Sequence, residues 1–420
     1  MADPSRAWRA ALVLLLTSLV AACGMRTLKR DLEKTGGLAG VDGQVAISGG
    51  GTSPIVVVAR SVADGRIIDS FVLARPGPFF FALPAGTYQV AAFEDRNRDL
   101  SYQPGEPAVL APGDLVLQPG ERRRGLDLTI ISDGGVRLPF EVSGASHAQR
   151  QLDQLPALQL GTVVSIDDPR FSAENGKLGL WNPVQFLFDV GAGIYFLEEY
   201  DPKKIPVLFV HGATGHPDEW RYLISQLDRN RFQPWLAYYP TAPPLDQLGR
   251  QLLRTLSALQ VKYGFSRLML VAHSMGGLVT RSALNYAAQN AGAGRLVRVP
   301  AFVSISSPWN GHWGAAKGVK HAPVVAPSWN DMAPDSAFLT KLPGTPLLPE
   351  CEYSLLFSYR GGGAFGGESN DGSVAVSSEL SLPIQRQAAR VMGFNETHTS
   401  ILRSADVAAQ LNTILTRASQ

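Results

Sequence analysis

The sequence predicts an α/β protein: a mostly parallel sheet with helices on both faces, preceded by a small all-β sandwich module. From residue 205 to 420, continuous apolar segments alternate with stretches of helical composition, which is typical of buried parallel strands and their crossover helices. Short β-rich segments separated by Gly and Pro occupy residues 41–135, which indicates a small antiparallel sandwich. A chain of 420 residues is long enough for two such domains.

The composition is globular and carries no strong charge bias. Hydrophobic residues make up 45% of the chain and charged residues 18%, which excludes wholesale disorder. The 38 Lys and Arg nearly balance the 36 Asp and Glu, so no basic field exists for nucleic acid and no nucleic-acid partner is expected. With only two cysteines, a disulfide framework and a four-Cys zinc site are excluded.

The N-terminus has the features of a secretory leader. A short basic region precedes an apolar run at residues 10–22, which is too short to span a bilayer as a helix. The run ends in LVAAC, which resembles the bacterial lipobox, where the Cys becomes the lipidated first residue of the mature protein. The resemblance implies a signal peptide over 1–22, lipidation of Cys23 and attachment to the bacterial cell envelope. Because Gly24 rather than Asp follows, the outer membrane is the expected site; an ordinary cleaved signal peptide is the alternative.

Residues 23–40 are interpreted as a tether and residues 41–135 as the β module. The stretch 79–107 resembles the carboxypeptidase-regulatory or transthyretin-like modules of many secreted enzymes, and the resemblance implies packing or binding rather than catalysis. The expected strands lie at residues 55–58, 67–73, 79–83, 88–93 and 126–131.

One loop of the module has the spacing of a calcium-binding loop. Asp95, Asn97, Asp99 and Glu106 fall at positions 1, 3, 5 and 12 of an EF-hand-like pattern, and their oxygens suit Ca²⁺. The position that normally needs Gly is Leu100, however, and no flanking helices are expected. A solvated acidic turn is the other reading, and we assign neither a metal nor a cofactor.

Residues 136–204 are harder to place. Helical composition at 149–158 and turn signals at Asp168-Pro169 and Asn182-Pro183 fit a connecting region, which could also form an edge or a cap of the second body. Residues 205–420 form the predicted α/β body. Its expected strands lie at 206–210, 235–239, 268–272, 297–305, 353–359 and 388–394, and its expected helices at 218–227, 245–263, 277–288 and 399–418.

Ser274 lies where an apolar strand meets a helix, in the sequence VAHSMGG. A serine in so tight a turn needs small neighbours two residues before and after it, here Ala272 and Gly276. The turn raises the hydroxyl above the sheet, and the helix N-terminus favours developing negative charge. This pattern resembles the nucleophile elbow of the α/β-hydrolase lipases, with Ala in place of the first Gly. Similar patterns at 46–50 and 361–366 are rejected because neither leads into a helix.

The resemblance implies that an acid and then a histidine follow the serine along the chain. His398 is the only histidine beyond residue 321, and it follows the last expected strand. Asp371 lies in a loop similar to the Asp-Gly-x-Val loop of many lipases, with Glu368 as its rival. In this reading His398 takes the proton of Ser274, while Asp371 holds the imidazole tautomer and stabilises the imidazolium.

An oxyanion hole needs two backbone N–H donors. The resemblance implies one from Met275, directly after the nucleophile, and one from Ala213 in the loop that follows the first strand of the body. His211 and Gly212 resemble the His-Gly pair that orders this loop in the family. Residues 308–345, rich in Trp and Pro, suit a lid or an acyl-binding wall, and a packed cap without substrate contact is the alternative.

The resemblance covers roughly residues 205–419. It implies an α/β-hydrolase serine esterase or lipase, similar to lipases and to the GPI inositol-deacylase-like group, that cleaves lipid or acyl esters through an acyl-enzyme. The predicted partners are that ester substrate and a membrane bound through lipidated Cys23. An acyltransferase using the same acyl-enzyme and a non-catalytic lipoprotein binding module remain the alternatives.

Overall fold

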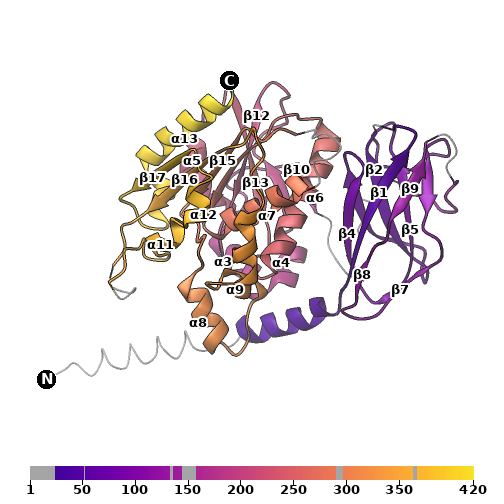
Figure 1. Cartoon of the computed structure of the whole chain (residues 1–420), viewed down its shortest axis with the longest axis horizontal. Helices are drawn as coiled ribbons and strands as arrows, with labels where there is room; N and C mark the ends of the chain where they lie inside the picture. Colours follow the sequence, from indigo (N-terminus) through magenta and orange to yellow (C-terminus); the bar gives the residue numbers. More distant parts are fainter. Residues whose placement is uncertain (1–23, 52, 133–135, 144–157, 290–296, 363–366) are drawn as a thin grey trace.

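Two bodies, a β module and a larger α/β body, make up the computed structural model (Figure 1). The structure describes residues 24–51, 53–132, 136–143, 158–289, 297–362 and 367–420. The predicted signal peptide over 1–22, the predicted lipidation site Cys23 and most of the helical stretch predicted at 149–158 lie outside these residues.

The β module contains two sheets. Its strands are β1 (Ala39–Ser48), β2 (Ile55–Ser61), β3 (Ile67–Leu73), β4 (Gly77–Leu83), β5 (Gly86–Glu94), β6 (Ala108–Leu110), β7 (Leu115–Leu117), β8 (Arg122–Arg124) and β9 (Leu128–Ile131). One sheet has the order β4-β1-β8 with β9 also on β1, and the other has the order β3-β2-β5-β6 with β7 also on β5. Since β8 and β9 pair with β1 in parallel, the prediction of a purely antiparallel sandwich is wrong for the first sheet.

The module has a hydrophobic core of its own between the two sheets. Val41, Phe81 and Ile130 from one sheet pack with Val57 and Val90 from the other, and each is at most 1% exposed. Burying a side chain of this kind stabilises the fold by about 1.5–3 kcal/mol relative to exposure. The alternation of inward and outward residues along each strand makes this possible.

The α/β body is built on a single eight-stranded sheet. Its strands are β10 (Gln159–Val163), β11 (Gly193–Phe196), β12 (Ile205–Val210), β13 (Phe232–Tyr238), β14 (Met269–His273), β15 (Ala301–Ile305), β16 (Glu352–Ser358) and β17 (Arg390–Phe394). The order is β10-β11-β13-β12-β14-β15-β16-β17, and the run from β13 to β17 is parallel. β10 and β11 run in the opposite direction, because β11 pairs antiparallel with β13.

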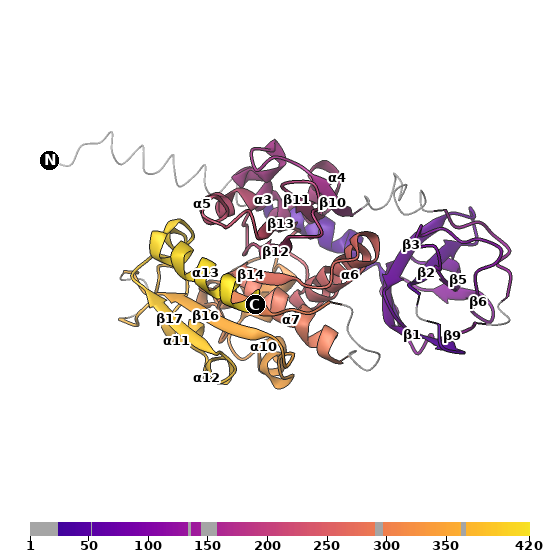
Figure 2. The ribbon, with the colours of Figure 1, turned by 90° about the horizontal axis from the view of Figure 1, so that it is seen from above.

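Helices cover both faces of this sheet, and Figure 2 shows α6 on the side toward the β module. In β12, Leu208 and Val210 point into one core while Val207 and Phe209 point into the other, so a continuous apolar strand serves both faces. The helices are α3 (Ala173–Trp181), α4 (Pro183–Asp189), α5 (Arg221–Ser225), α6 (Leu245–Tyr263), α7 (Met275–Gln289), α8 (Trp313–His321), α9 (Pro327–Met332), α10 (Ala337–Lys341), α11 (Val376–Glu379), α12 (Leu382–Gln385) and α13 (Ala405–Ala418).

The body begins before residue 205, the predicted boundary. β10, α3, α4 and β11 lie within the range 136–204, and two of them are strands of the main sheet. The sequence left open whether residues 136–204 form a connecting region, an edge or a cap of the body. In the structure, β10 and β11 form one edge of the sheet. Phe186 of α4 and Tyr195 of β11 are completely buried in one hydrophobic cluster with β12 and β13, so these elements share the core of the body.

The segment predicted as a tether is mostly a helix, over residues 24–36. Leu28 is completely buried and packs with Leu180, Ala242 and Ala326 of the α/β body. Asp31 is 1% exposed, and its Oδ2 accepts the backbone N–H of Val184, 3.1 Å away, at the N-terminus of α4. The tether prediction is wrong for these residues because the helix buries one face against the body.

α6 fixes the β module to the body. Ala258 and Val261 of α6 pack against the outer face of the sheet that contains β2 and β5. The guanidinium of Arg254 forms a bidentate ion pair with the carboxylate of Asp69 in β3, with N–O distances of 2.5 and 3.2 Å. Arg254 is 7% exposed and Asp69 8%, so this ion pair is buried between the two bodies.

We expect Arg254→Ala to lower the free energy of unfolding by about 3 kcal/mol, because removing one partner leaves a buried charge without its counter-charge. Arg250→Ala is the matched control: Arg250 pairs with Asp42 at 2.8 Å one turn earlier in α6, but both side chains are about one-third exposed. That variant should cost no more than about 1 kcal/mol. Urea unfolding measures both losses, and equal losses would contradict the prediction.

Among the described residues, no helix is both long enough and apolar enough to cross a membrane.

Candidate active site

Ser274 lies in the turn between β14 and α7, at the carboxyl edge of the sheet. Its φ of 54° falls in the left-handed region, which is strained for a residue with a Cβ. Neighbouring backbone comes very close: a Cβ on Gly276 would lie 2.4 Å from the carbonyl oxygen of Val210, and one on Gly212 would lie 2.7 Å from the Cβ of Ser274. Both positions therefore require glycine.

Ser274, His398 and Asp371 form a hydrogen-bonded line. Nε2 of His398 lies 3.0 Å from Oγ of Ser274, and Nδ1 of His398 lies 2.6 Å from Oδ2 of Asp371. The backbone N–H of His398 also donates to the carbonyl oxygen of Asp371, at 2.9 Å. The structure thus brings together three predicted residues from loops that follow β14, β16 and β17.

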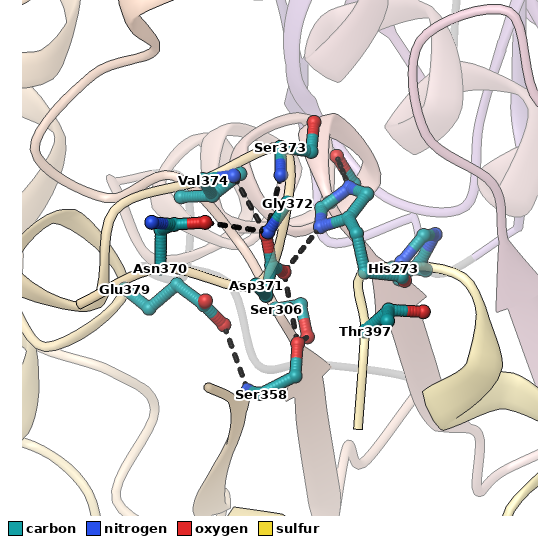
Figure 3. Close-up of polar contacts among 12 residues, drawn as sticks. His273, Ser306, Ser358, Asn370, Asp371, Gly372, Ser373, Val374, Glu379 and Thr397 are labelled. Carbon is teal, nitrogen blue, oxygen red and sulfur yellow. Dashed lines mark hydrogen bonds and ion pairs between the residues drawn. The ribbon is translucent and has the colours of Figure 1, made fainter. Parts of the chain in front are cut away.

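The carboxylate of Asp371 is completely buried and surrounded by donors (Figure 3). Oδ1 accepts the backbone N–H groups of Ser373 and Val374, and Oδ2 accepts the hydroxyl of Ser358 as well as His398. Burial raises the pKa of Asp371, but the hydrogen bond and charge of His398 and the two amides outweigh it and hold the pKa below its usual value. The ionised carboxylate keeps the His398 proton on Nδ1, which leaves Nε2 free to accept the serine proton.

The rival acid, Glu368, is exposed, and its carboxylate bonds the hydroxyl of Ser377. Asp371 alone of these two carboxylates contacts His398 in the structure.

A second buried carboxyl group, Glu379, lies beside Asp371 (Figure 3), and no role in the site was predicted for it from the sequence. Glu379 is 1% exposed at the end of α11, and its Oε2 accepts the backbone N–H of Ser358 at 3.2 Å. Burial and then the negative charge of Asp371 raise the pKa of Glu379 to about 10. At neutral pH the site therefore holds one ionised carboxylate and one neutral carboxylic acid, both bonded to Ser358.

His273 supports the loop that carries His398. Its Nε2–H donates to the carbonyl oxygen of His398 at 2.8 Å, and the two rings lie 4.7 Å apart. Burial and the nearby His398 lower the pKa of His273 to about 3, so it stays neutral. This contact suits a structural residue rather than a base.

The predicted oxyanion loop follows β12. His211 is completely buried; its Nδ1–H donates to the carbonyl of Gly212 at 2.8 Å, and burial lowers its pKa to about 4. The hydroxyl of Tyr239 donates to the carbonyl oxygen of His211 at 2.6 Å, which fixes the loop from the other side. Met275 is the first residue of α7, so its N–H has no acceptor within the helix. Ala213 directly follows Gly212, where an added Cβ would lie 2.7 Å from the Cβ of Ser274.

Residues 308–345 contain α8, α9 and α10. Trp309, Met332 and Leu339 are at most 6% exposed and pack into the core, whereas Trp313 is 57% exposed. His312 caps α8 by accepting the backbone N–H of Ala315, and its other ring nitrogen lies 3.4 Å from Oγ of Ser373. Most apolar residues of this segment are thus packed, as expected for a cap. A role of the segment as a lid stays a prediction.

In the loop with calcium-binding spacing, residues 95–106, the carboxylates of Asp95 and Glu106 accept backbone N–H groups of the same loop. Asp95 accepts the backbone N–H groups of Asp99 and Leu100, and Glu106 accepts those of Arg96 and Gln103. Such bonds stabilise an acidic turn without an ion. In the described part of the chain, no group of three or more His, Cys, Asp or Glu is arranged to hold a metal.

Residues 201–341 match a family of serine esterases. The family is described as "Putative serine esterase (DUF676)", and the match includes Ser274 and the predicted oxyanion loop. No curated protein matches the chain. The match and the strand-turn-helix geometry support an α/β hydrolase that acts on esters.

Several solved structures are similar to part of the chain. The mature lipase BlEst2 of Bacillus licheniformis is 19% identical, with 53% of this chain and 94% of that one covered and a TM-score of 0.40. Phospholipase PlaB of Legionella pneumophila is 17% identical, with a TM-score of 0.34. That match covers 42% of this chain and 45% of PlaB, so this chain spans less than half of that protein.

Proposed function

We propose that this protein is a membrane-anchored serine hydrolase that cleaves carboxylic esters of lipid or acyl type. The observation that carries the proposal is the hydrogen-bonded line from Ser274 through His398 to the buried Asp371. A weak nucleophile, a base and a carboxylate that orients the base are the parts that acyl transfer requires.

In the proposed mechanism, Oγ of Ser274 attacks the ester carbonyl carbon while Nε2 of His398 takes its proton. Asp371 stabilises the resulting imidazolium. The tetrahedral oxyanion accepts hydrogen bonds from the N–H groups of Met275 and Ala213, and loss of one such donor costs about 3 kcal/mol. His398 then protonates the leaving alkoxide, which leaves Ser274 acylated. Water attacks this ester by the same sequence and releases the acid.

The proposal includes attachment to the membrane through a lipid on Cys23. A diacylglyceryl thioether together with an N-acyl chain supplies more than one hydrocarbon chain, which is enough for stable anchoring. The near-neutral charge of the chain, +2, means that a general electrostatic attraction would not hold it there.

A fluorophosphonate probe tests the proposed chemistry, because it phosphonylates a serine only when an adjacent base activates it. The wild-type protein should be labelled and Ser274→Ala should not. Ser48→Ala is the matched control, since Ser48 occupies the second small-x-Ser-x-Gly pattern of the chain and should leave labelling unchanged. Equal labelling of wild type and Ser274→Ala, or no labelling of either, would contradict the proposal.

A further inference from the structure

The chain enters the α/β body immediately after the predicted lipid attachment site. A Cβ on Gly24 would lie 3.5 Å from the ring of Trp181, and the hydroxyl of Thr27 donates to the carbonyl oxygen of Trp181 at 3.0 Å. The described helix over 24–36 then packs along the body through Leu28. Consecutive Cα atoms are about 3.8 Å apart, and Cys23 directly precedes Gly24 in the sequence, so a lipid on Cys23 would lie one residue from this contact.

This entry point lies close to α8. The ring of Trp181 packs edge-on against Trp329, with centroids 5.7 Å apart. Trp329 in turn lies against α8, because a Cβ on Gly318 would be 2.6 Å from its ring. Figure 1 shows α8 next to the helix over 24–36. The rings of Trp181 and Trp329 thus connect Gly24, next to the predicted lipid attachment site, to α8.

The outward face of α8 is basic and carries an exposed aromatic ring. Trp313, Lys317 and Lys320 are exposed and lie at positions i, i+4 and i+7, which share one side of a helix. Ala315, on the opposite side, is 3% exposed. Lysines combined with tryptophan on the outer side are typical of helices that lie in a membrane interface.

The helix over 24–36 adds four more exposed cations, which are Arg26, Lys29, Arg30 and Lys34. Two of them have an acidic neighbour: Arg30 lies 3.6 Å from the buried Asp31, and Lys29 lies 3.9 Å from Glu33. The whole chain has a net charge of only +2, so this concentration does not follow from a generally basic surface. Clusters of Lys and Arg directly beside a membrane anchor bind anionic lipid headgroups.

We propose that these residues form a docking face for an anionic phospholipid bilayer, in which Trp313 enters the interface while the cations contact headgroups. The face consists of Arg26, Lys29, Arg30, Trp313, Lys317 and Lys320. It rests on the lipid attachment proposed above, which brings the bilayer to Gly24. His312, at the N-terminus of α8, contacts Ser373 of the Asp371 loop, so this docking brings the candidate active site close to membrane esters.

Tryptophan quenching tests the docking face. The full chain, produced with its leader in a bacterial host, is reconstituted into brominated phosphatidylcholine vesicles with or without phosphatidylglycerol. We expect the bromines to quench a fraction of the wild-type tryptophan fluorescence. In Trp313→Phe this quenched fraction should be lost. This fraction should be larger with phosphatidylglycerol and should fall in Lys317→Glu. Lys203→Glu is the charge-matched control, because Lys203 is exposed just before β12, at the opposite edge of the sheet from Ser274.

The outcomes separate this inference from the proposed enzyme activity. Hydrolysis of a water-soluble short-chain ester should be equal in wild type, Lys317→Glu and Lys203→Glu. If no ester is hydrolysed, the proposed function fails while the quenching result stands. Quenching that is the same in wild type and Trp313→Phe, or a wild-type protein that associates with neither kind of vesicle, would overturn the docking face. Quenching that does not depend on phosphatidylglycerol would overturn its selectivity for anionic lipid.

Discussion

Exchanging Asp371 for Asn is expected to lower kcat for ester hydrolysis by about four orders of magnitude. The amide would have to replace a carboxylate that accepts the amides of Ser373 and Val374, the hydroxyl of Ser358 and His398. It brings an NH₂ group into a place lined by donors. The carboxamide neither stabilises an imidazolium nor reliably holds the His398 proton on Nδ1, so Nε2 loses its role as a base.

Glu368→Gln is the matched control, since Glu368 lies three residues away but bonds Ser377 at the surface. Its kcat should stay within about twofold of wild type, as expected for a surface substitution outside the site. Steady-state kinetics on a soluble ester, with circular dichroism to verify folding, measure both variants. A large loss in Glu368→Gln with activity retained in Asp371→Asn would reverse the assignment of the acid.

The second large effect concerns pH and Glu379. Its pKa is about 10 in the folded protein and 4.5 when unperturbed, so between these values the folded state holds a proton that the unfolded state releases. The stability that this proton contributes is complete below about pH 4.5 and is lost as the pH rises toward 10. Relative to Glu379→Gln, which carries no titrating proton, wild type should lose about 1.4 kcal/mol of unfolding free energy per pH unit within this window.

Urea unfolding of both proteins at about pH 5, 7 and 9 measures this difference. The exposed Glu199→Gln is the control and should follow the wild-type curve. Because glutamine is neutral and similar in shape, Glu379→Gln should also keep most of the hydrolytic activity at neutral pH. Parallel stability curves for wild type and Glu379→Gln would show that Glu379 is ionised in the folded protein.

The central elements of the α/β body could be predicted because their sequence pattern is long and continuous. The apolar run at 206–210 becomes β12, and the helical pattern at 245–263 becomes α6 with the same bounds. β11 was not predicted because it has only four residues and starts at a glycine, so its pairing with β13 rather than its composition makes it a strand. The helix over 24–36 was missed for a similar reason, since only the body gives Leu28 a place to be buried.

Ser274, Asp371 and His398 could be selected from the sequence as candidates because each follows a recognisable strand. Glu379 gave no such signal: it reaches Ser358 across 21 residues of sequence, and only the folded chain places it beside Asp371. His312 is similar, because its contact with Ser373 joins loops 61 residues apart. Candidate residues in motifs near strand ends can therefore be predicted from the sequence. Residues such as Glu379 and His312, which contact the site from distant segments, cannot, because their positions depend on how the chain packs.

The position of β11 at the side of β13 limits how this protein can be shortened for laboratory work. A recombinant fragment starting at residue 205, where the regular pattern begins, would lack β10, β11, α3 and α4. It would leave the backbone of β13 unpaired along Trp235–Tyr238, which is the kind of open strand edge that leads to aggregation. A version that starts at Gly24 keeps that edge covered and retains the buried contacts of Leu28, and is therefore the fragment to choose for crystallisation or directed evolution.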